Sequence, residues 1–163
     1  MNPPAAPLPV GPVAPRLRLR AVRASDYDRV YAWHVAAFKT HIEQIWNWNE
    51  DWQQRDFAAL FAAVPPRIVI YEGTAVGYIQ IQARANDLHL VNIALDEQVR
   101  GLGLGGRLIG MLQARAAAND QGVTLKVFKS NSRAEALYSR LGFLRCGQTA
   151  AHHRMQWLQS MIS

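Results

Sequence analysis

The spacing of apolar residues changes along the chain between the period of a β-strand and that of an α-helix. Residues 16–22 alternate basic and apolar side chains, which predicts a strand with one solvent-facing side at the edge of a sheet. After a predicted capping-box start at Ser25 and Asp28, apolar residues recur at helical spacing. A second helix, with Trp52 and Phe57 on its apolar side, is predicted to end before two consecutive prolines. The chain is therefore expected to begin with a strand and two helices.

Three further strands form a predicted antiparallel meander, joined by short polar turns. They cover residues 67–73, 74–83 and 88–95. From Leu104 to Ala116 an apolar residue recurs every fourth position, which is typical of a helix with a buried stripe. Residues 123–129 form the next predicted strand. Because a crossover helix leads to it, this strand is expected to run parallel to the strand before it.

The last predicted helix begins with a capping box at Ser132 and Glu135 and ends at Gly142. Two more strands are expected over residues 143–149 and 150–157. The resulting order is β-α-α-β-β-β-α-β-α-β-β. This order predicts an α/β (α+β) fold with a mixed, mostly antiparallel sheet of about seven strands and helices on both faces.

Composition divides the chain into an N-terminal leader and a single expected domain. Residues 1–15 are rich in proline and alanine and carry no charged side chain, which predicts a flexible leader outside the fold. Residues 16–163 are expected to form a single domain. No apolar stretch is long enough to span a bilayer, and the single cysteine excludes an internal disulfide. We therefore expect a cytoplasmic protein that does not act at a membrane.

The net charge favours anionic partners in general but not nucleic acid. The chain has 18 basic and 12 acidic side chains, a formal net charge of +6. A positive protein attracts phosphorylated ligands as well as polynucleotides. The basic residues are scattered rather than clustered, so nucleic-acid binding is not expected.

A glycine-rich run, E-Q-V-R-G-L-G-L-G-G-R-L-I at residues 97–109, carries the strongest chemical signal. Gly101, Gly103 and Gly106 match the G-x-G-x-x-G pattern of a dinucleotide site, but the strand before them is the third of a meander. A nucleotide-triphosphate loop requires a lysine that is missing here. A tight strand-to-helix turn would explain one or two of the glycines. Backbone N–H groups at the start of a helix would suit a pyrophosphate.

The same run resembles the acetyl-CoA-binding signature of the GNAT superfamily of N-acetyltransferases, [QR]-x-x-G-x-[GA]. A second family segment, N-x-x-A-x-x-x-Y-x-x-x-G-F, is matched by "NSRAEALYSRLGF" at residues 131–143. The resemblance covers about residues 16–158, and the predicted element order corresponds to the family's fold. The segment "HIEQIWNWNEDWQQRDF" is similar to that of a small bacterial subgroup with E-Q-I-W-G-W-D-E, with Asn47 and Asn49 in place of its glycine and aspartate.

The resemblance implies that the protein uses acetyl-CoA as a co-substrate and needs no metal. The segment expected to hold the pyrophosphate consists of Arg100, Gly101, Leu102, Gly103, Leu104, Gly105 and Gly106. The strand residues Ile93, Ala94 and Leu95 are expected to pair with the pantetheine arm like an added strand, next to a gap between this strand and the next. Asn131, Ala134 and Tyr138 are the remaining expected contacts of acetyl-CoA.

The implied reaction is direct attack of an amine on the thioester. Tyr138 is the candidate general acid for the leaving thiolate, although its spacing also suits a core aromatic residue. Glu43 is the candidate general base, with His41 and Asp87 as further possibilities; His89 is more typical of a packed strand histidine. Glutamate in the later strand, used by ribosomal-protein acetyltransferases of the superfamily, is replaced here by Lys126.

The acceptor is expected to be an amine, either a small molecule or a peptide. His41, Trp46 and Asn92 are the candidate residues for binding it, because an aromatic ring attracts a cation. Dimers are common in the superfamily, so a homodimer is expected. The alternative is a non-catalytic acyl-CoA-binding or regulatory module with the same fold.

Overall fold

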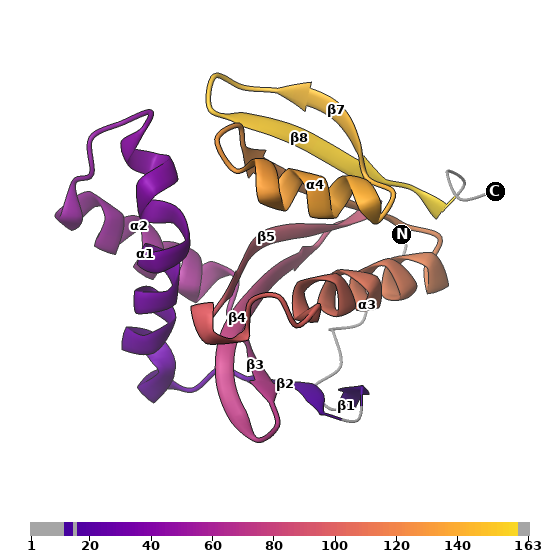
Figure 1. The fold of residues 1–163 in the computed structure, drawn as a ribbon, viewed down its shortest axis with the longest axis horizontal. Helices are drawn as coiled ribbons and strands as arrows, with labels where there is room; N and C mark the ends of the chain where they lie inside the picture. The colour runs from indigo at the N-terminus through magenta and orange to yellow at the C-terminus, as the bar shows by residue number, and fades with distance from the viewer. Residues whose placement is uncertain (1–11, 15, 160–163) are drawn as a thin grey trace. The chain divides into compact units, whose positions relative to one another are not determined.

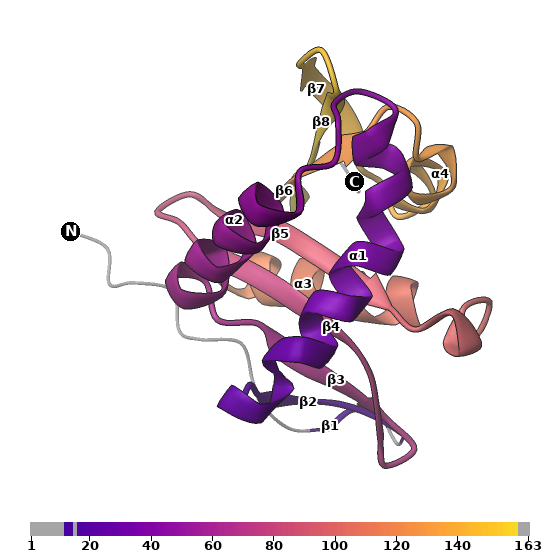
Figure 2. The ribbon, with the colours of Figure 1, turned by 90° about the vertical axis from the view of Figure 1, so that its left-hand side faces the viewer.

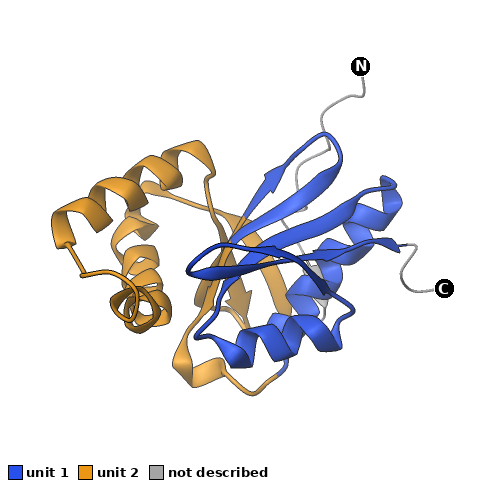
Figure 3. Cartoon of the chain, turned by 90° about the horizontal axis from the view of Figure 1, so that it is seen from above, with its two compact units in different colours: residues 1–9, 81–91, 103–163 blue, residues 10–80, 92–102 orange. Residues whose placement is uncertain are grey.

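The computed structural model describes residues 12–14 and 16–159, which form two compact units (Figure 3). Among the described residues, unit 1 comprises residues 81–91 and 103–159, and unit 2 comprises residues 12–14, 16–80 and 92–102. Both units are assembled from separate stretches of the chain, because two long strands, β4 (Thr74–Ala83) and β5 (Asp87–Leu95), pass from one unit to the other.

The strands and helices follow the predicted order (Figure 1). The strands are β1 (Pro12–Ala14), β2 (Leu17–Ala21), β3 (Arg67–Tyr71), β4 (Thr74–Ala83), β5 (Asp87–Leu95), β6 (Gly122–Phe128), β7 (Leu144–Gln148) and β8 (His152–Trp157). The helices are α1 (Tyr27–Glu43), α2 (Glu50–Ala63), α3 (Leu104–Ala118) and α4 (Ser132–Arg140), with short 3-10 turns at Ala24–Asp26 and Glu97–Val99.

Hydrogen bonding joins the strands in the order β1-β2-β3-β4-β5-β6-β8-β7. β5 and β6 are parallel, whereas β2/β3, β3/β4, β6/β8 and β7/β8 are antiparallel. The predicted mixed, mostly antiparallel sheet is thus confirmed. The strand that the sequence did not predict is β1, which lies within the proline-rich segment expected to be a flexible leader; residues 1–11 and 15 of that segment lie outside the described residues.

In unit 2, α1 and α2 lie on the same side of β3 and β4 (Figure 2). Their apolar sides meet the strands in one core cluster, made of Val30, Trp33, Phe57, Ile68, Ile70, Tyr78 and Ala94. Phe57 is buried as expected, but Trp52 on the same helix is 54% exposed. The edge position predicted for β2 is wrong, because β1 pairs with it on the side away from β3.

The predicted capping box at Ser25 and Asp28 is also wrong. Asp26 takes this role, and both of its carboxylate oxygens are engaged. They accept hydrogen bonds from the Arg20 guanidinium, 2.8 Å each, and from the Arg23 N–H at 2.7 Å. The bidentate contact with Arg20 lowers the pKa of Asp26 to about 2.

In unit 1, α3 and α4 each contact β6. The predicted stripe on α3 is confirmed, since Leu104, Leu108, Leu112 and Ala116 are all buried. The side chain of Gln113 joins the two helices by donating to the Leu141 carbonyl at 2.7 Å. No helix in residues 12–14 and 16–159 combines the length and apolar character that a membrane crossing requires.

The predicted capping box of α4 begins one residue too late. The N-cap is Asn131 rather than Ser132, and the Asn131 Oδ1 accepts from the Ala134 N–H at 3.2 Å. Gly142 ends the helix with a left-handed φ of +94°, as its position predicts.

Candidate functional site

The loop between β5 and α3 is folded by a side-chain cap and two left-handed glycines. Asp96 accepts from the Gln98 N–H at 3.0 Å, and its own N–H donates to the Val76 carbonyl at 2.7 Å. Gly101 and Gly103 have φ values of +85° and +77°. Because a β-carbon disfavours this region of φ, these two positions require glycine for the path of the backbone.

The first turn of α3 presents backbone donors without a partner inside the helix. The first helical bond of α3 runs from the Arg107 N–H to the Gly103 carbonyl, 3.1 Å. The N–H groups of Leu104, Gly105 and Gly106 precede it in the helix, where no carbonyl one turn earlier can accept from them. Such donors, together with the helix dipole, make an anion-binding site.

In unit 2, the last part of β5 carries the predicted residues Ile93, Ala94 and Leu95. Ala94 is buried, and the other two are half-buried. The parallel pairing of β5 with β6 covers Asp87 to Leu90, so the predicted pantetheine-pairing residues lie beyond it.

Asn92 lies on the same strand and is held by a residue that the sequence did not single out. Its Nδ2 donates to Gln80 Oε1 at 2.9 Å, and Gln80 Nε2 donates to the Val64 carbonyl at 3.0 Å. Gln80 is 1% exposed, so both ends of its amide are used inside the protein. These two bonds fix the orientation of the Asn92 amide.

Tyr138 is buried on α4, with its ring against Phe143 at a centroid distance of 5.8 Å. Burial raises the pKa of Tyr138 to about 12. The phenol is therefore protonated at neutral pH and can donate a hydrogen bond. Asn131 and Ala134 share the N-terminal turn of the same helix, where the Asn131 cap accounts for their contact with each other.

The acceptor-side residues lie at the end of α1 and in the loop after it. Glu43 is exposed and pairs with Lys39 at 3.7 Å, and Trp46 is 53% exposed. His41 is half-buried on the same helix. Glu43, His41 and Trp46 thus lie in one short segment of unit 2, at the end of α1 and directly after it.

Glu50 holds this segment in shape. Its carboxylate accepts from Trp48 Nε1 at 2.7 Å, from the Tyr31 hydroxyl at 2.7 Å and from Gln54 Nε2 at 2.9 Å. These hydrogen bonds, that of Trp48 foremost, lower the pKa of Glu50 to about 2. The carboxylate therefore ties α1, the loop and α2 together, a role that the sequence pattern did not reveal.

A histidine–tyrosine pair inside unit 2 was also missed. His34 Nδ1 lies 3.2 Å from the Tyr78 hydroxyl, and the His34 ring packs against Phe57 at 5.1 Å. Burial lowers the pKa of His34 to about 4 and raises that of Tyr78 above its ordinary value. Both groups are therefore neutral at pH 7, which suits a place in the core.

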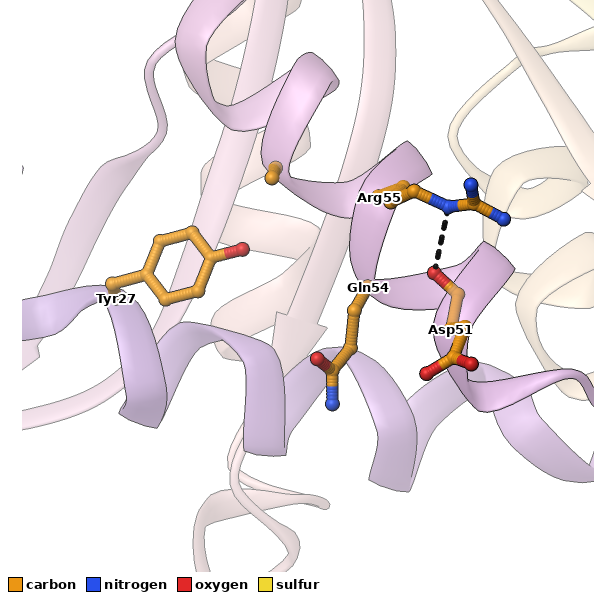
Figure 4. Close-up of a pocket in the computed structure, with 5 residues that line it drawn as sticks. Tyr27, Asp51, Gln54 and Arg55 are labelled. Carbon is orange, nitrogen blue, oxygen red and sulfur yellow. Dashed lines mark hydrogen bonds between the residues drawn. The ribbon is translucent and has the colours of Figure 1, made fainter.

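A shallow depression lies over α1 and α2 and is lined by Tyr27, Asp51, Gln54, Arg55 and Ala58 (Figure 4). Within it, Arg55 Nε donates to the Asp51 carbonyl at 3.3 Å. None of the predicted site residues lines this depression.

Comparison with curated proteins finds acetyltransferases. A mycothiol acetyltransferase of Salinispora tropica is 32% identical over an alignment of 151 positions, which covers 86% of this chain and 48% of that protein. The 5-NmdU N-acetyltransferase of Pseudomonas phage PaMx11 is 36% identical over 81 residues, 48% of this chain and 56% of that protein. The chain spans about half the length of the curated relatives it matches.

Solved structures of similar fold include two with coenzyme A. The PaiA N-acetyltransferase of Thermoplasma acidophilum in complex with coenzyme A is 14% identical, with a TM-score of 0.67, over 87% of this chain and 98% of that one. Spermidine N-acetyltransferase of Vibrio cholerae, in complex with CoA and spermine, is 16% identical, with a TM-score of 0.64, over 92% and 100% of the two chains. The model of the acetyltransferase (GNAT) family matches residues 27–143, a range that contains both the glycine run and the Asn131–Phe143 segment. This chain belongs to the GNAT family of acetyltransferases.

Proposed function

We propose that this protein transfers an acetyl group from acetyl-CoA to an amine. The observation that carries the proposal is the start of α3, where the N–H groups of residues 104–106 have no helical partner and follow two left-handed glycines. A pyrophosphate fits such a turn because its oxygens accept from several N–H groups at once. Membership of the GNAT family supports acetyl-CoA as the carrier of that pyrophosphate.

Arg100 to Gly106 would hold the pyrophosphate, and Ile93 to Leu95 would pair with the pantetheine amides through their backbone groups. The N-cap Asn131, together with Ala134 and Tyr138 of α4, would contact the rest of acetyl-CoA. Asn131 already uses its Oδ1 as the helix cap, so its Nδ2 is the atom available to the ligand.

In the reaction, the amine nitrogen attacks the thioester carbonyl carbon, a C–N bond forms and the C–S bond breaks. Tyr138 would donate its hydroxyl proton to the leaving sulfur, and its raised pKa keeps that proton in place until the thiolate forms. Backbone N–H groups near Ala94 would polarise the carbonyl oxygen. Glu43, in the aromatic segment, is the sequence's candidate for the base, and its exposed carboxylate would also attract a cationic amine.

The acceptor is proposed to be a small-molecule or peptide amine, bound near His41, Trp46 and Asn92. Two relatives of this chain are named for acetylation of mycothiol and of 5-NmdU. A solved structure of similar fold is named for spermidine and holds spermine. Trp46, with its ring exposed, is suited to contact a cationic amine. The homodimer expected from the superfamily stays a prediction.

Calorimetric titration with acetyl-CoA, with NAD as the control ligand, tests the binding step. A panel of primary amines, scored by release of free CoA thiol, then tests transfer. Tyr138→Phe is expected to lower turnover while leaving the affinity for acetyl-CoA nearly unchanged, since the ring is kept. Absence of acetyl-CoA binding would refute the proposal, and binding without turnover of any amine would favour the non-catalytic alternative.

A further inference from the structure

Unit 1 contains a chain of three polar side chains that the proposed function does not use. The parallel register of β5 and β6 puts His89 directly opposite Thr124. His89 Nδ1 lies 2.9 Å from Thr124 Oγ1, and Thr124 Oγ1 lies 2.8 Å from Asp87 Oδ2. The three groups therefore form a continuous Asp87–Thr124–His89 relay across two strands.

Chemistry fixes the direction of both hydrogen bonds. An ionised carboxylate only accepts, so the single hydroxyl proton of Thr124 must point to Asp87. The Thr124 oxygen can then only accept from His89, which requires the proton of the neutral imidazole to lie on Nδ1. The lone pair on Nε2 is consequently available to take a proton. This arrangement sets the histidine tautomer through a hydrogen-bonded partner, as activated histidines require.

The surroundings keep the ring neutral at pH 7. His89 is half-buried. The charged groups that face it are Arg84 at the end of β4, Asp87 on its own strand and Lys126 on β6. Burial first, and then Arg84 and Lys126, lower the pKa of His89 below its usual value, whereas Asp87 raises it. The relay also lies next to the last paired position, Leu90 with Leu125, where β5 leaves β6.

We propose that His89 is the general base of the acetyl transfer, and that Thr124 and Asp87 are its positioning residues. The inference rests on the proposed function. As the amine nitrogen bonds to the carbonyl carbon, the nitrogen becomes acidic and its proton passes to His89 Nε2. The C–S bond breaks and the sulfur takes the proton of Tyr138, so that the products are the N-acetyl compound and CoA thiol. His89 then releases its proton to solvent, and Tyr138 regains one from solvent.

His89 is better prepared for this role than Glu43. The Glu43 carboxylate is exposed and shared with Lys39. The Nε2 lone pair of His89, in contrast, belongs to a half-buried ring whose tautomer is set by two hydrogen bonds shorter than 3 Å. A base poised near neutral pH is also the more effective proton acceptor.

The kinetic test uses the primary amine that gives the fastest CoA release in the panel. kcat/KM is measured between pH 5 and pH 9 for the wild type, His89→Gln, Asp87→Asn and His153→Gln. His153 is a matched control, a half-buried strand histidine on β8 outside the relay. His89→Gln is expected to lower the rate by about 10²–10⁴-fold, the usual worth of a general base. It also removes one ionisation from the acid limb of the profile.

The Asp87→Asn variant distinguishes a general base from a merely structural histidine, because only a base would change the position of the acid limb of the pH profile. Because Asp87 raises the pKa of His89, its loss is expected to shift the acid limb to lower pH. Ionisation of the acceptor amine affects every variant alike, so only the difference between profiles is assigned to His89. A rate and profile of His89→Gln equal to those of the wild type would overturn the proposal while leaving acetyl transfer itself intact.

A second measurement examines the relay without turnover. Long-range ¹H–¹⁵N correlation spectra of the free protein are expected to show the Nδ1-protonated tautomer for His89, and its loss in Thr124→Val. The opposite tautomer in the wild type would overturn the proposal. If acetyl-CoA binds but no amine is acetylated, the proposed function fails and His89 loses its role as a base with it.

Discussion

Replacement of Gly77 by alanine is the sharpest test of how unit 2 is built. Gly77 follows the irregularity in the β3–β4 ladder, where Val69 pairs with Gly77 but Ile70 pairs with Ala75. A β-carbon at position 77 would lie 2.2 Å from the Ala94 carbonyl oxygen and 2.9 Å from Leu95 Cα. Non-bonded carbon atoms prefer about 3.5 Å or more. The obstacle is backbone of β5, so a change of rotamer cannot remove the clash.

The size of the effect follows from this geometry. Overpacking of a core costs about 1–3 kcal/mol when side chains can adjust. Here the neighbouring atoms belong to the backbone of β5, which is hydrogen-bonded to β4 and cannot move away easily. We therefore expect a loss of about 3 kcal/mol in the free energy of unfolding. For a chain of this size, each kcal/mol shifts the melting temperature by about 2–4 °C, which makes the expected fall about 6–12 °C. Displacement of Ala94 and Leu95 should also weaken acetyl-CoA binding.

Gly110→Ala is the matched control. A β-carbon at position 110 meets nothing within 4 Å beyond the backbone of its own helix α3. The same substitution should there raise stability by about 0.5–1 kcal/mol, because glycine weakens a helix interior. Thermal unfolding followed by circular dichroism, with calorimetric titration of acetyl-CoA, measures both variants. A Gly77→Ala protein as stable as the wild type, with unchanged affinity, would show that the close approach of β4 and β5 is wrong.

Two further predictions concern side chains that stabilise single elements, one in each unit. Asn131→Ala should lower the free energy of unfolding by about 0.5–2 kcal/mol through loss of the α4 cap, whereas Asn131→Asp should keep the cap; equal urea midpoints for the two variants would contradict this. Because Asp26 has its pKa lowered to about 2 in the folded state, from 3.8, its stabilising effect is present above pH 4 and is lost as the pH falls toward 2. Urea unfolding between pH 2 and pH 6 should therefore show a weaker pH dependence in Asp26→Asn, and an unchanged slope would refute the role of its pair with Arg20.

Much of the fold could be predicted from the sequence because local patterns determine it. The four-residue recurrence of Leu104, Leu108 and Leu112 is also the spacing of the buried side of α3. Glu72 and Gly73 form the predicted hairpin turn with φ values of +49° and +81°. Two of the errors fall at helix starts, and at the start of α4 two adjacent residues can both act as caps. Asn131 and Ser132 are such a pair, and the backbone of the loop decides between them.

The site was less predictable because its polar contacts are non-local. Gln80 belongs to a run from Val76 to Gln80 that is buried throughout, so strand alternation gives no sign that its amide is inside. Its function as a support for Asn92 depends on the pairing of β4 with β5. The same holds for His89, whose partner Thr124 is 35 residues away in the chain. Only the register of two parallel strands makes them neighbours.

The glycine run shows how the structure separates a requirement of the fold from one of the ligand. Gly101 and Gly103 are explained by their positive φ values. At Gly105 and Gly106, a β-carbon would lie 3.5 Å and 3.8 Å from the side chain of Leu137, which is ordinary contact, and α3 would gain about 0.5–1 kcal/mol from each alanine. The fold therefore gives no reason for glycine at these two positions. The proposed binding of a pyrophosphate to the N–H groups of the first turn would give one, since a close approach is easier where no side chain stands beside the donors.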